Sequence, residues 1–184
     1  MISFSPFPVI TTERLLLRPL ATTDDEEIFT IRSNEIGNQY LGRPKASSIE
    51  DARVFIEKII SGIANNVSIF WAIVLPPSNK LAGTICLWNI DDANHIAEIG
   101  YELHPDHYGK GIMQEAMLKV IEYAFDIMQL QTIDAYVHQN NERSIKLLEK
   151  FNFTRHIPTS RPKPAEEEPY MLIYSLNESN RRKI

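Results

Sequence analysis

HPDHYGKGIMQEAM, residues 104–117, separates a strand-like run from a long helical pattern. The apolar residues from Met113 to about Met128 recur at three- and four-residue steps, which predicts a helix. The first N–H groups of a helix have no partner within it, and the helix dipole adds partial positive charge there. Because Gly109 and Gly111 let the backbone approach a ligand closely, this turn predicts an anion-binding site. The same glycines are also compatible with a tight strand-to-helix turn and nothing more.

Two nucleotide-binding motifs do not fit this turn. A dinucleotide fingerprint requires a third glycine, but residue 114 is Gln, and the turn follows several strands instead of opening the first strand–helix–strand unit. A P-loop requires Gly-Lys followed by Ser or Thr, which Lys110-Gly111-Ile112 does not supply. The turn therefore matches neither of these two nucleotide-binding motifs.

Strand-like runs lie on both sides of the turn. The apolar run Leu15–Leu17 predicts a first strand at Val9–Pro19, and β-branched and aromatic residues predict strands at Val67–Leu75 and Leu81–Ile90. Further strands are predicted at Ile96–Leu103, Thr132–Val137, Phe153–Ile157 and Tyr170–Leu176. Short turns join the second, third and fourth of these, which indicates an antiparallel meander. A helical crossover joins parallel strands, so the run at 132–137 should lie parallel to the run at 96–103. The fold class is α+β.

Three further helices are predicted. Thr23 and Glu26 have the spacing of a capping box, which favours a helix over about Asp24–Asn34. Ser47 and Glu50 repeat that spacing before a helical pattern at Ile49–Asn65. A further helix is expected at Asn141–Phe151, and the prolines and glutamates of Arg161–Pro169 predict a loop.

Composition narrows the function classes. The chain has 184 residues and 43% hydrophobic residues, which suits a single domain over 1–184. Its net charge is -5 and its longest basic run is a short tail at Arg181, which argues against nucleic-acid binding. No apolar run approaches the length of a membrane span, and no signal peptide is recognisable. The single cysteine, Cys86, is expected to be a small buried hydrophobe, and we expect a cytoplasmic protein.

Several segments together resemble the GNAT N-acetyltransferase superfamily. Ala97–Leu103 and Tyr108–Ala116 look like its acetyl-CoA motif, and Asn141–Ser144 with Leu147–Phe153 is similar to the next motif. Thr12–Pro19 (TERLLLRP) resembles the RimJ/RimL-type branch, named for ribosomal-protein N-terminal acetyltransferases. The resemblance spans about Val9 to Leu176. It departs from the family pattern at Asp106, where Gln or Arg is usual, and at Asn152, where Gly is usual and Asn is the next-best residue for a left-handed helix end.

The resemblance implies a GNAT-like sheet with a central pair of parallel strands that splay apart, Ile96–Leu103 and Thr132–His138. It implies acetyl-CoA as cosubstrate, with its arm between those strands, and direct attack by the acceptor in a ternary complex. A freed backbone N–H near Tyr101–Leu103 would polarise the acetyl carbonyl. The residues expected to bind acetyl-CoA are Tyr101, Leu103, His107, Tyr108, Gly109, Lys110, Gly111, Ile112, Asn141 and Ser144.

Two residues carry the expected chemistry. Glu98 is the candidate base, since some members use a glutamate at this position, and strand alternation puts it on one face with Gly100 and Glu102. The alternative is a surface glutamate on a half-exposed strand. Many relatives protonate the thiolate with a tyrosine at the position of Leu148, so Ser144 is the nearest substitute. Ser144 would equally suit the first turn of a helix capped by Asn141.

The acceptor is expected to be a primary amine, either a peptide or protein N-terminus or a small molecule. The helices at Asp24–Asn34 and Ile49–Asn65 should wall its site, with His138 a candidate lining residue and Trp71, Trp88 and Tyr136 mainly in the core. The histidine spacing does not predict a metal site. A homodimer is common in this branch. The alternative function is a non-catalytic acyl-CoA-binding sensor or partner module on the same fold.

Overall fold

Three consecutive strands form the centre of the sheet in the computed structural model, which describes residues 2–156 and 170–181. They are β3 (Ile69–Val74), β4 (Leu81–Asp91) and β5 (Ile96–Leu103), and each is antiparallel to the next. The predicted meander is therefore confirmed. β4 is buried from Leu81 to Leu87, as expected of a strand covered on both faces.

The long helix after β5 returns the chain to the sheet as a parallel strand. α4 (Ile112–Glu122) leads to β6 (Thr132–His138), which pairs parallel with β5, as predicted. β8 (Met171–Asn177) and β7 (Thr154–His156) complete the sheet among the described residues, in the order β1-β2-β3-β4-β5-β6-β8-β7. Only β5 and β6 are parallel among these pairs, so the mixed, mostly antiparallel sheet of the predicted α+β fold is confirmed.

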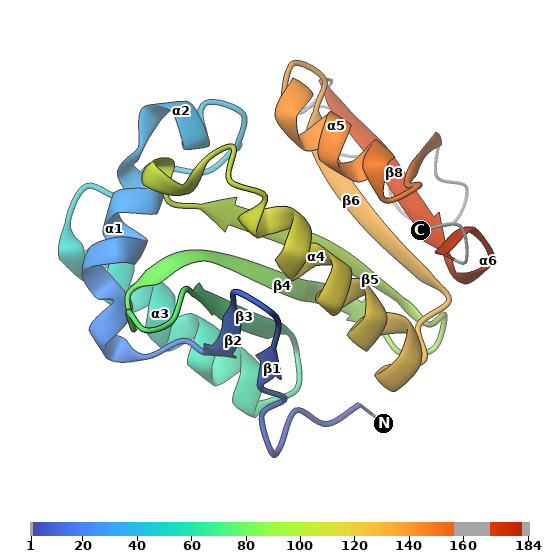
Figure 1. The fold of residues 1–184 in the computed structure, drawn as a ribbon, viewed down its shortest axis with the longest axis horizontal. Coiled ribbons are helices and arrows are strands. Elements are labelled where there is room, and N and C mark those ends of the chain that lie inside the picture. The colour runs from blue at the N-terminus through green and yellow to red at the C-terminus, as the bar shows by residue number, and fades with distance from the viewer. Residues whose placement is uncertain (1, 157–169, 182–184) are drawn as a thin grey trace.

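The parallel pair separates part of the way along. Its paired register ends at Glu98 and Asp134, although β5 continues to Leu103 and β6 to His138. Figure 1 shows β6 diverging from β5 toward the end that carries α5 (Glu142–Lys150). The predicted splay is therefore present, and it leaves backbone groups along the edge of β5 available to a ligand.

Helices cover both faces of the sheet (Figure 1). One core joins α4 and α5 to β4, β5 and β6 through residues such as Met117, Leu148 and Ile99. A second, smaller core joins α1 (Asp25–Ser33) and α3 (Ile49–Ala64) to the opposite face. The two faces beside the separated strands are thus walled by different helices.

The N-terminal segment differs from its prediction. Val9–Pro19 was expected to be one strand but forms two antiparallel strands, β1 (Ile10–Thr11) and β2 (Leu16–Pro19). The reason is a turn held by Thr12, whose hydroxyl accepts from the Leu15 N–H at 2.8 Å and whose N–H donates to the Leu15 carbonyl at 2.9 Å.

Both predicted capping boxes named the wrong residues. The first helical segment begins with η1 (Thr22–Asp24), where the Asp24 carboxylate accepts from the Ala21 N–H at 2.8 Å. α3 is capped by Ser48 and Asp51, not by Ser47 and Glu50. In each case the aspartate three residues after the cap bonds back to its N–H, and its short side chain suits that reach.

Other boundaries were also missed. The helix predicted to reach Met128 is α-helical only to Glu122. A π-helical turn follows, η3 (Tyr123–Ile127), in which the Met128 N–H donates to the Tyr123 carbonyl. The short helices η2 (Pro105–His107), α2 (Glu35–Asn38) and α6 (Glu178–Arg181) were not predicted. Ile157 and the predicted loop at 161–169 lie outside the described residues. Within the described ranges, no helix is long and apolar enough to cross a membrane.

Candidate active site

The glycine turn has an open backbone. Gly109 has φ +72° and Gly111 has φ +71°, both in the left-handed region that favours glycine. Gly111 is the N-cap of α4, so the first N–H groups of that helix are at the turn. A Cβ added at Gly109 would meet no heavy atom of the described residues within 4 Å. An anion can therefore reach this backbone closely, and the residues fit a pyrophosphate.

Thr12 and Arg14, in the turn between β1 and β2, hydrogen-bond to the glycine turn and to α4. The Arg14 guanidinium donates from Nη1 to the Lys110 carbonyl at 3.1 Å, and the Thr12 hydroxyl donates to Glu115 in the first turn of α4. Burial raises the pKa of Glu115, but the hydrogen bonds from Thr12 and Arg14 outweigh it and hold that pKa below its usual value. These contacts give the TERLLLRP motif a structural role that the sequence did not reveal.

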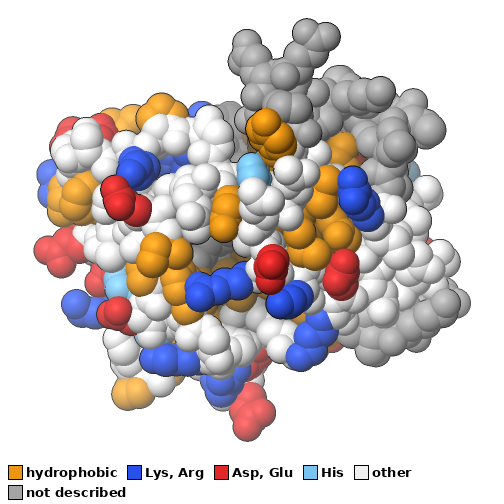
Figure 2. All heavy atoms as spheres, turned by 90° about the horizontal axis from the view of Figure 1, so that it is seen from above, with side chains coloured by type: hydrophobic (Ala, Val, Ile, Leu, Met, Phe, Trp, Pro, Cys, Tyr) orange, Lys and Arg blue, Asp and Glu red, His pale blue; other side chains and the backbone are white. Residues whose placement is uncertain are grey.

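A cleft of about 1600 Å³ passes between the separated strands. Its lining comes from the glycine turn, from both faces of β5 and β6, and from α2 and α5. Figure 2 looks onto this end of the molecule and shows the surface hollowed near its centre, with charged side chains of both signs around the hollow. Pockets for one small ligand are commonly about 300–1,000 Å³, so this cleft has room for two substrates.

The α5 side of the cleft brings several predicted residues together. Asn141 caps α5, and its Oδ1 accepts from the Ser144 N–H at 3.2 Å. Ser144 Oγ lies 2.6 Å from the Tyr101 hydroxyl on β5. Burial raises the pKa of Tyr101 to about 12, against the opposing effect of its bond to Ser144. Leu103 lines the same part of the cleft.

Residues of the turn itself divide into two groups. His107, Tyr108 and Ile112 line the cleft with the glycines, whereas Lys110 is exposed and is not among the lining residues. Burial and the nearby charges of His104 and Lys110 lower the pKa of His107, which favours its neutral imidazole. Burial raises the pKa of Tyr108, whose ring lies 5.4 Å from the Arg143 guanidinium.

Glu98 lies on the opposite face, at the point where the strands separate. It is 6% exposed, so the alternative of a surface glutamate is wrong. Asn89 Nδ2 donates to Glu98 Oε1 at 2.6 Å, from a bulge of β4 where Asn89 has φ +47°. Gly100 follows on the same face, and a Cβ there would lie 3.0 Å from Cys86 Sγ. Cys86 is buried, as predicted, and burial raises the pKa of its thiol.

An arginine closes this face of the cleft. Arg43, which follows α2, pairs with Glu102 and donates from Nη2 to Asn38 Oδ1 at 2.8 Å. Asn38 is itself fixed by bonds from its Nδ2 to the carbonyls of Ile31 and Asn34. The predicted walls contribute Ile31 from α1 and Phe55 from α3, but α2 and the segment to Arg43 contribute more. Sequence patterns gave no signal for the pairing of Arg43 with Glu102, because the two residues are far apart in the chain.

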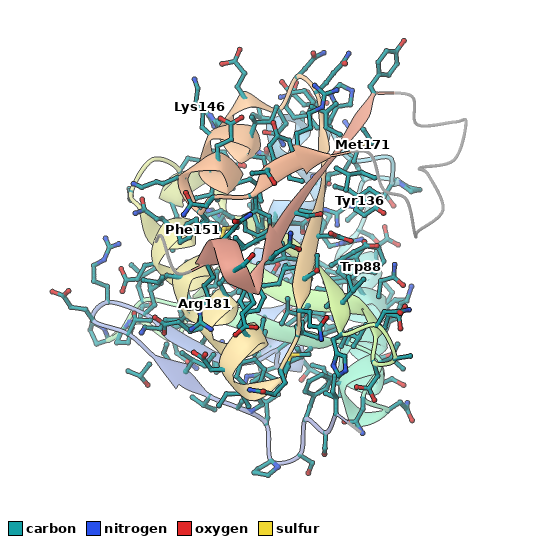
Figure 3. All side chains as sticks on the ribbon, turned by 90° about the vertical axis from the view of Figure 1, so that its right-hand side faces the viewer. Trp88, Tyr136, Lys146, Phe151, Met171 and Arg181 are labelled. Atoms are coloured by element: carbon teal, nitrogen blue, oxygen red, sulfur yellow. The ribbon has the colours of Figure 1, made fainter. Side chains whose placement is uncertain are left out.

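Several aromatic side chains line the cleft together with Glu98. Trp71 is fully buried as predicted, but Trp88 is 47% exposed and lines the cleft with Tyr136, so placing these two mainly in the core was wrong. Figure 3 shows Trp88, Tyr136 and Met171 in a row on one side of the molecule. His138 also lines the cleft and stacks on Tyr40, with ring centroids 5.3 Å apart.

The metal-binding residue types do not gather at this cleft. Within residues 2–156 and 170–181, no group of three or more His, Cys, Asp or Glu side chains is arranged to hold a metal ion.

Comparison with known proteins identifies the family. Residues 14–154 match the model of the acetyltransferase (GNAT) domain. The chain is 35% identical to the uncharacterized N-acetyltransferase YoaA of Bacillus subtilis over 149 residues, which cover 81% of this chain and 84% of that one. A shorter match of 74 residues, 40% of each chain, is 38% identical to the putative ribosomal N-acetyltransferase YdaF of the same organism.

Among solved structures, the microcin C7 self-immunity acetyltransferase MccE, in complex with acetyl-CoA and AMP, superposes with a TM-score of 0.77. It is 25% identical, and the match covers 90% of this chain and 93% of that one. The family match, the mixed sheet with its splayed strands and the open glycine turn agree with one another. The chain therefore belongs to the GNAT family of acetyl-CoA-dependent N-acetyltransferases.

Proposed function

We propose that this enzyme transfers the acetyl group of acetyl-CoA directly to a primary amine in a ternary complex. The observation that carries the proposal is the position of Glu98. This buried carboxylate is the last residue of β5 that pairs with β6, at the point where the cleft opens between the two strands. It is therefore within reach of an acceptor that enters from the α2 side.

The donor substrate would enter from the α4 and α5 side. The turn around Gly109 and the N-terminus of α4 would hold its pyrophosphate, and its arm would follow the edge of β5 past Asn141 and Ser144. The acetyl group would then lie beside backbone N–H groups near Tyr101–Leu103 that have no register partner on β6. A backbone N–H that hydrogen-bonds the acetyl carbonyl would stabilise the negative charge that develops on its oxygen, most strongly where water is excluded.

The acceptor would reach the acetyl group from the opposite face. Glu98, held by Asn89, would take the proton that the amine loses, either directly or through one water. Trp88, Tyr136 and Tyr40 would provide the apolar walls of the acceptor channel, with Arg43 and Glu102 at one side. A peptide or protein N-terminus and a small primary amine both suit this open, partly aromatic channel.

Thiol release from acetyl-CoA with a panel of acceptors tests the proposal. The panel would contain peptides with free N-termini, the same peptides blocked at the N-terminus but carrying a lysine, and small primary amines. Turnover with one class and mass-spectrometric detection of the acetylated product are expected. Tight binding of CoA without acetylation of any acceptor would contradict transfer and would favour a non-catalytic acyl-CoA-binding module.

A further inference from the structure

The hydroxyl of Ser144 is paired with the hydroxyl of Tyr101 inside the cleft. The two oxygens lie 2.6 Å apart and join β5 to the first turn of α5, across the part of the cleft where the strands have separated. Both side chains line the cleft. We propose that Tyr101 is a positioning residue that donates its hydrogen bond to Ser144 and so directs the Ser144 hydroxyl at the thioester sulfur. This inference rests on the proposed acetyl transfer.

The donor in this pair follows from the surroundings of the two oxygens. Ser144 uses its backbone N–H to bond Asn141, which fixes its place in the helix, while its hydroxyl remains free to rotate. The Tyr101 ring is fixed because it packs against the core that contains Ile99 and Met117. If the fixed Tyr101 hydroxyl donates to the Ser144 oxygen, the Ser144 hydroxyl proton is directed away from Tyr101. We infer that it points into the cleft, which both side chains line.

The Tyr101 hydroxyl is too weak an acid to give up its proton here. Burial raises its pKa to about 12, while an ordinary thiol has a pKa of about 8.5. A thiolate therefore accepts a hydrogen bond from this pair but does not remove its proton. The pair acts by stabilising negative charge on sulfur and remains neutral throughout the reaction.

The transfer step then balances without a protein acid. The amine nitrogen forms a bond to the acetyl carbon, the carbon–sulfur bond breaks, and its electron pair stays on sulfur. The proton lost by the amine goes to Glu98, either directly or through one water. The thiolate leaves with a hydrogen bond from Ser144 and takes a proton from solvent. The position of Leu148 is compatible with this scheme, because that side chain is fully buried and apolar and offers no hydroxyl.

A leaving-group experiment separates this role from a structural one. Tyr101→Phe, Ser144→Ala and the double variant are compared with Tyr123→Phe, which removes a phenol that packs on Trp71 away from the cleft. We expect kcat to fall about tenfold for Tyr101→Phe and about 30-fold for Ser144→Ala, with KM for acetyl-CoA within about twofold. The double variant should match Ser144→Ala, because Tyr101 acts through Ser144. With the acetyl selenoester of CoA, whose selenolate is a weaker base, both losses should shrink.

A second measurement does not depend on turnover. The thiol of CoA bound to the protein is titrated by its thiolate ultraviolet absorbance, with desulfo-CoA as the blank. We expect its pKa to lie below that of free CoA, and to return toward the free value in Tyr101→Phe and Ser144→Ala but not in Tyr123→Phe.

Other outcomes would overturn the proposal. It is wrong if Tyr101→Phe matches Tyr123→Phe in kcat and in the bound thiol pKa, or if the two single losses multiply in the double variant. It is also wrong if Tyr101→Phe is impaired while Ser144→Ala is not, since Tyr101 would then contact sulfur itself. A wild-type enzyme that acetylates no amine would instead refute the proposed function, and the thiol titration would still decide this inference.

Discussion

Arg14 is hydrogen-bonded to Glu115, which lies 101 positions later in the chain. Arg14 Nε donates to Glu115 Oε2 at 2.6 Å, and the Arg14 backbone N–H donates to Glu115 Oε1 at 3.0 Å. The same guanidinium reaches the Lys110 carbonyl. The turn between β1 and β2 is thereby attached to the glycine turn and to the first turn of α4. This attachment fixes the backbone that we propose for the pyrophosphate.

Replacing Arg14 with alanine should weaken acetyl-CoA binding. The variant would lose the two hydrogen bonds of the Arg14 side chain, to Glu115 and to the Lys110 carbonyl. A loss of about 1 kcal/mol in binding corresponds to about a fivefold rise in Kd. We expect kcat at saturating acetyl-CoA to change by less than about twofold. Calorimetric titration with CoA and steady-state kinetics measure the two effects. Arg53→Ala, which breaks an exposed pair with Asp25 on another face, is the matched control; equal effects of both variants would contradict the role of Arg14.

Glu115 gives this attachment a pH dependence. Its pKa is lowered in the folded protein, so its contribution to stability is complete above its usual value of about 4.3 and is lost as pH falls through the folded pKa. Thermal melting of the wild type and Glu115→Gln should therefore differ most above about pH 5 and converge on acidification. A gap in melting temperature that stays constant down to the acid limit would contradict this assignment.

Gly109→Ala tests the close approach of an anion to the turn. The added methyl has space, but alanine at φ +72° costs about 1–2 kcal/mol of stability, and the methyl would lie where the ligand approaches. We expect CoA affinity to fall at least about tenfold. Asn152→Ala places alanine at another positive φ, +59°, away from the cleft. It should lose similar stability and keep its CoA affinity, so equal losses of affinity in both variants would refute the proposed pyrophosphate site.

The elements that a local pattern specifies were predictable from the sequence. Strand alternation and short turns specified β3, β4 and β5, and the helical crossover specified the parallel pairing of β6 with β5. Gly109 and Gly111 marked a turn that does adopt positive φ at both positions. The strand alternation also placed Glu98 on one face with Gly100, although it did not show that Glu98 is buried.

Features that depend on residues distant in sequence were not predictable. Arg14 and Glu115 are 101 positions apart, and Tyr101 and Ser144 are 43 positions apart. No periodicity or spacing relates such pairs, since only the fold brings them together. The start of α3 was mispredicted for a different reason. Ser47 and Ser48 are both good caps, and the cap is Ser48 because its hydroxyl accepts from the Asp51 N–H.

Arg43→Met should affect the acceptor and not the donor. Arg43 is 27% exposed by its side chain and pairs with Glu102 on the acceptor face, so its loss leaves that carboxylate without its cation. We expect KM for the amine to change by about fivefold, with Kd for CoA unchanged. Lys45→Met, which breaks a more exposed pair with Glu35, is the matched control. A change in CoA affinity of similar size would show that Arg43 does not belong to the acceptor side.

Glu98→Gln should slow acetylation by an amount that depends on the acceptor. At pH 7 a lysine-like amine, with a pKa of about 10.4, is almost entirely protonated, whereas about 10–17% of an α-amino group with a pKa near 7.7–8.0 is neutral. We therefore expect kcat/KM at pH 7 to fall about 100-fold for the first class and about tenfold for the second. Raising the pH should reduce both deficits, because the amine then loses its proton without the carboxylate. The exposed Glu57→Gln on α3 is the control, and a Glu98 variant that matches it at every pH would exclude Glu98 as the base.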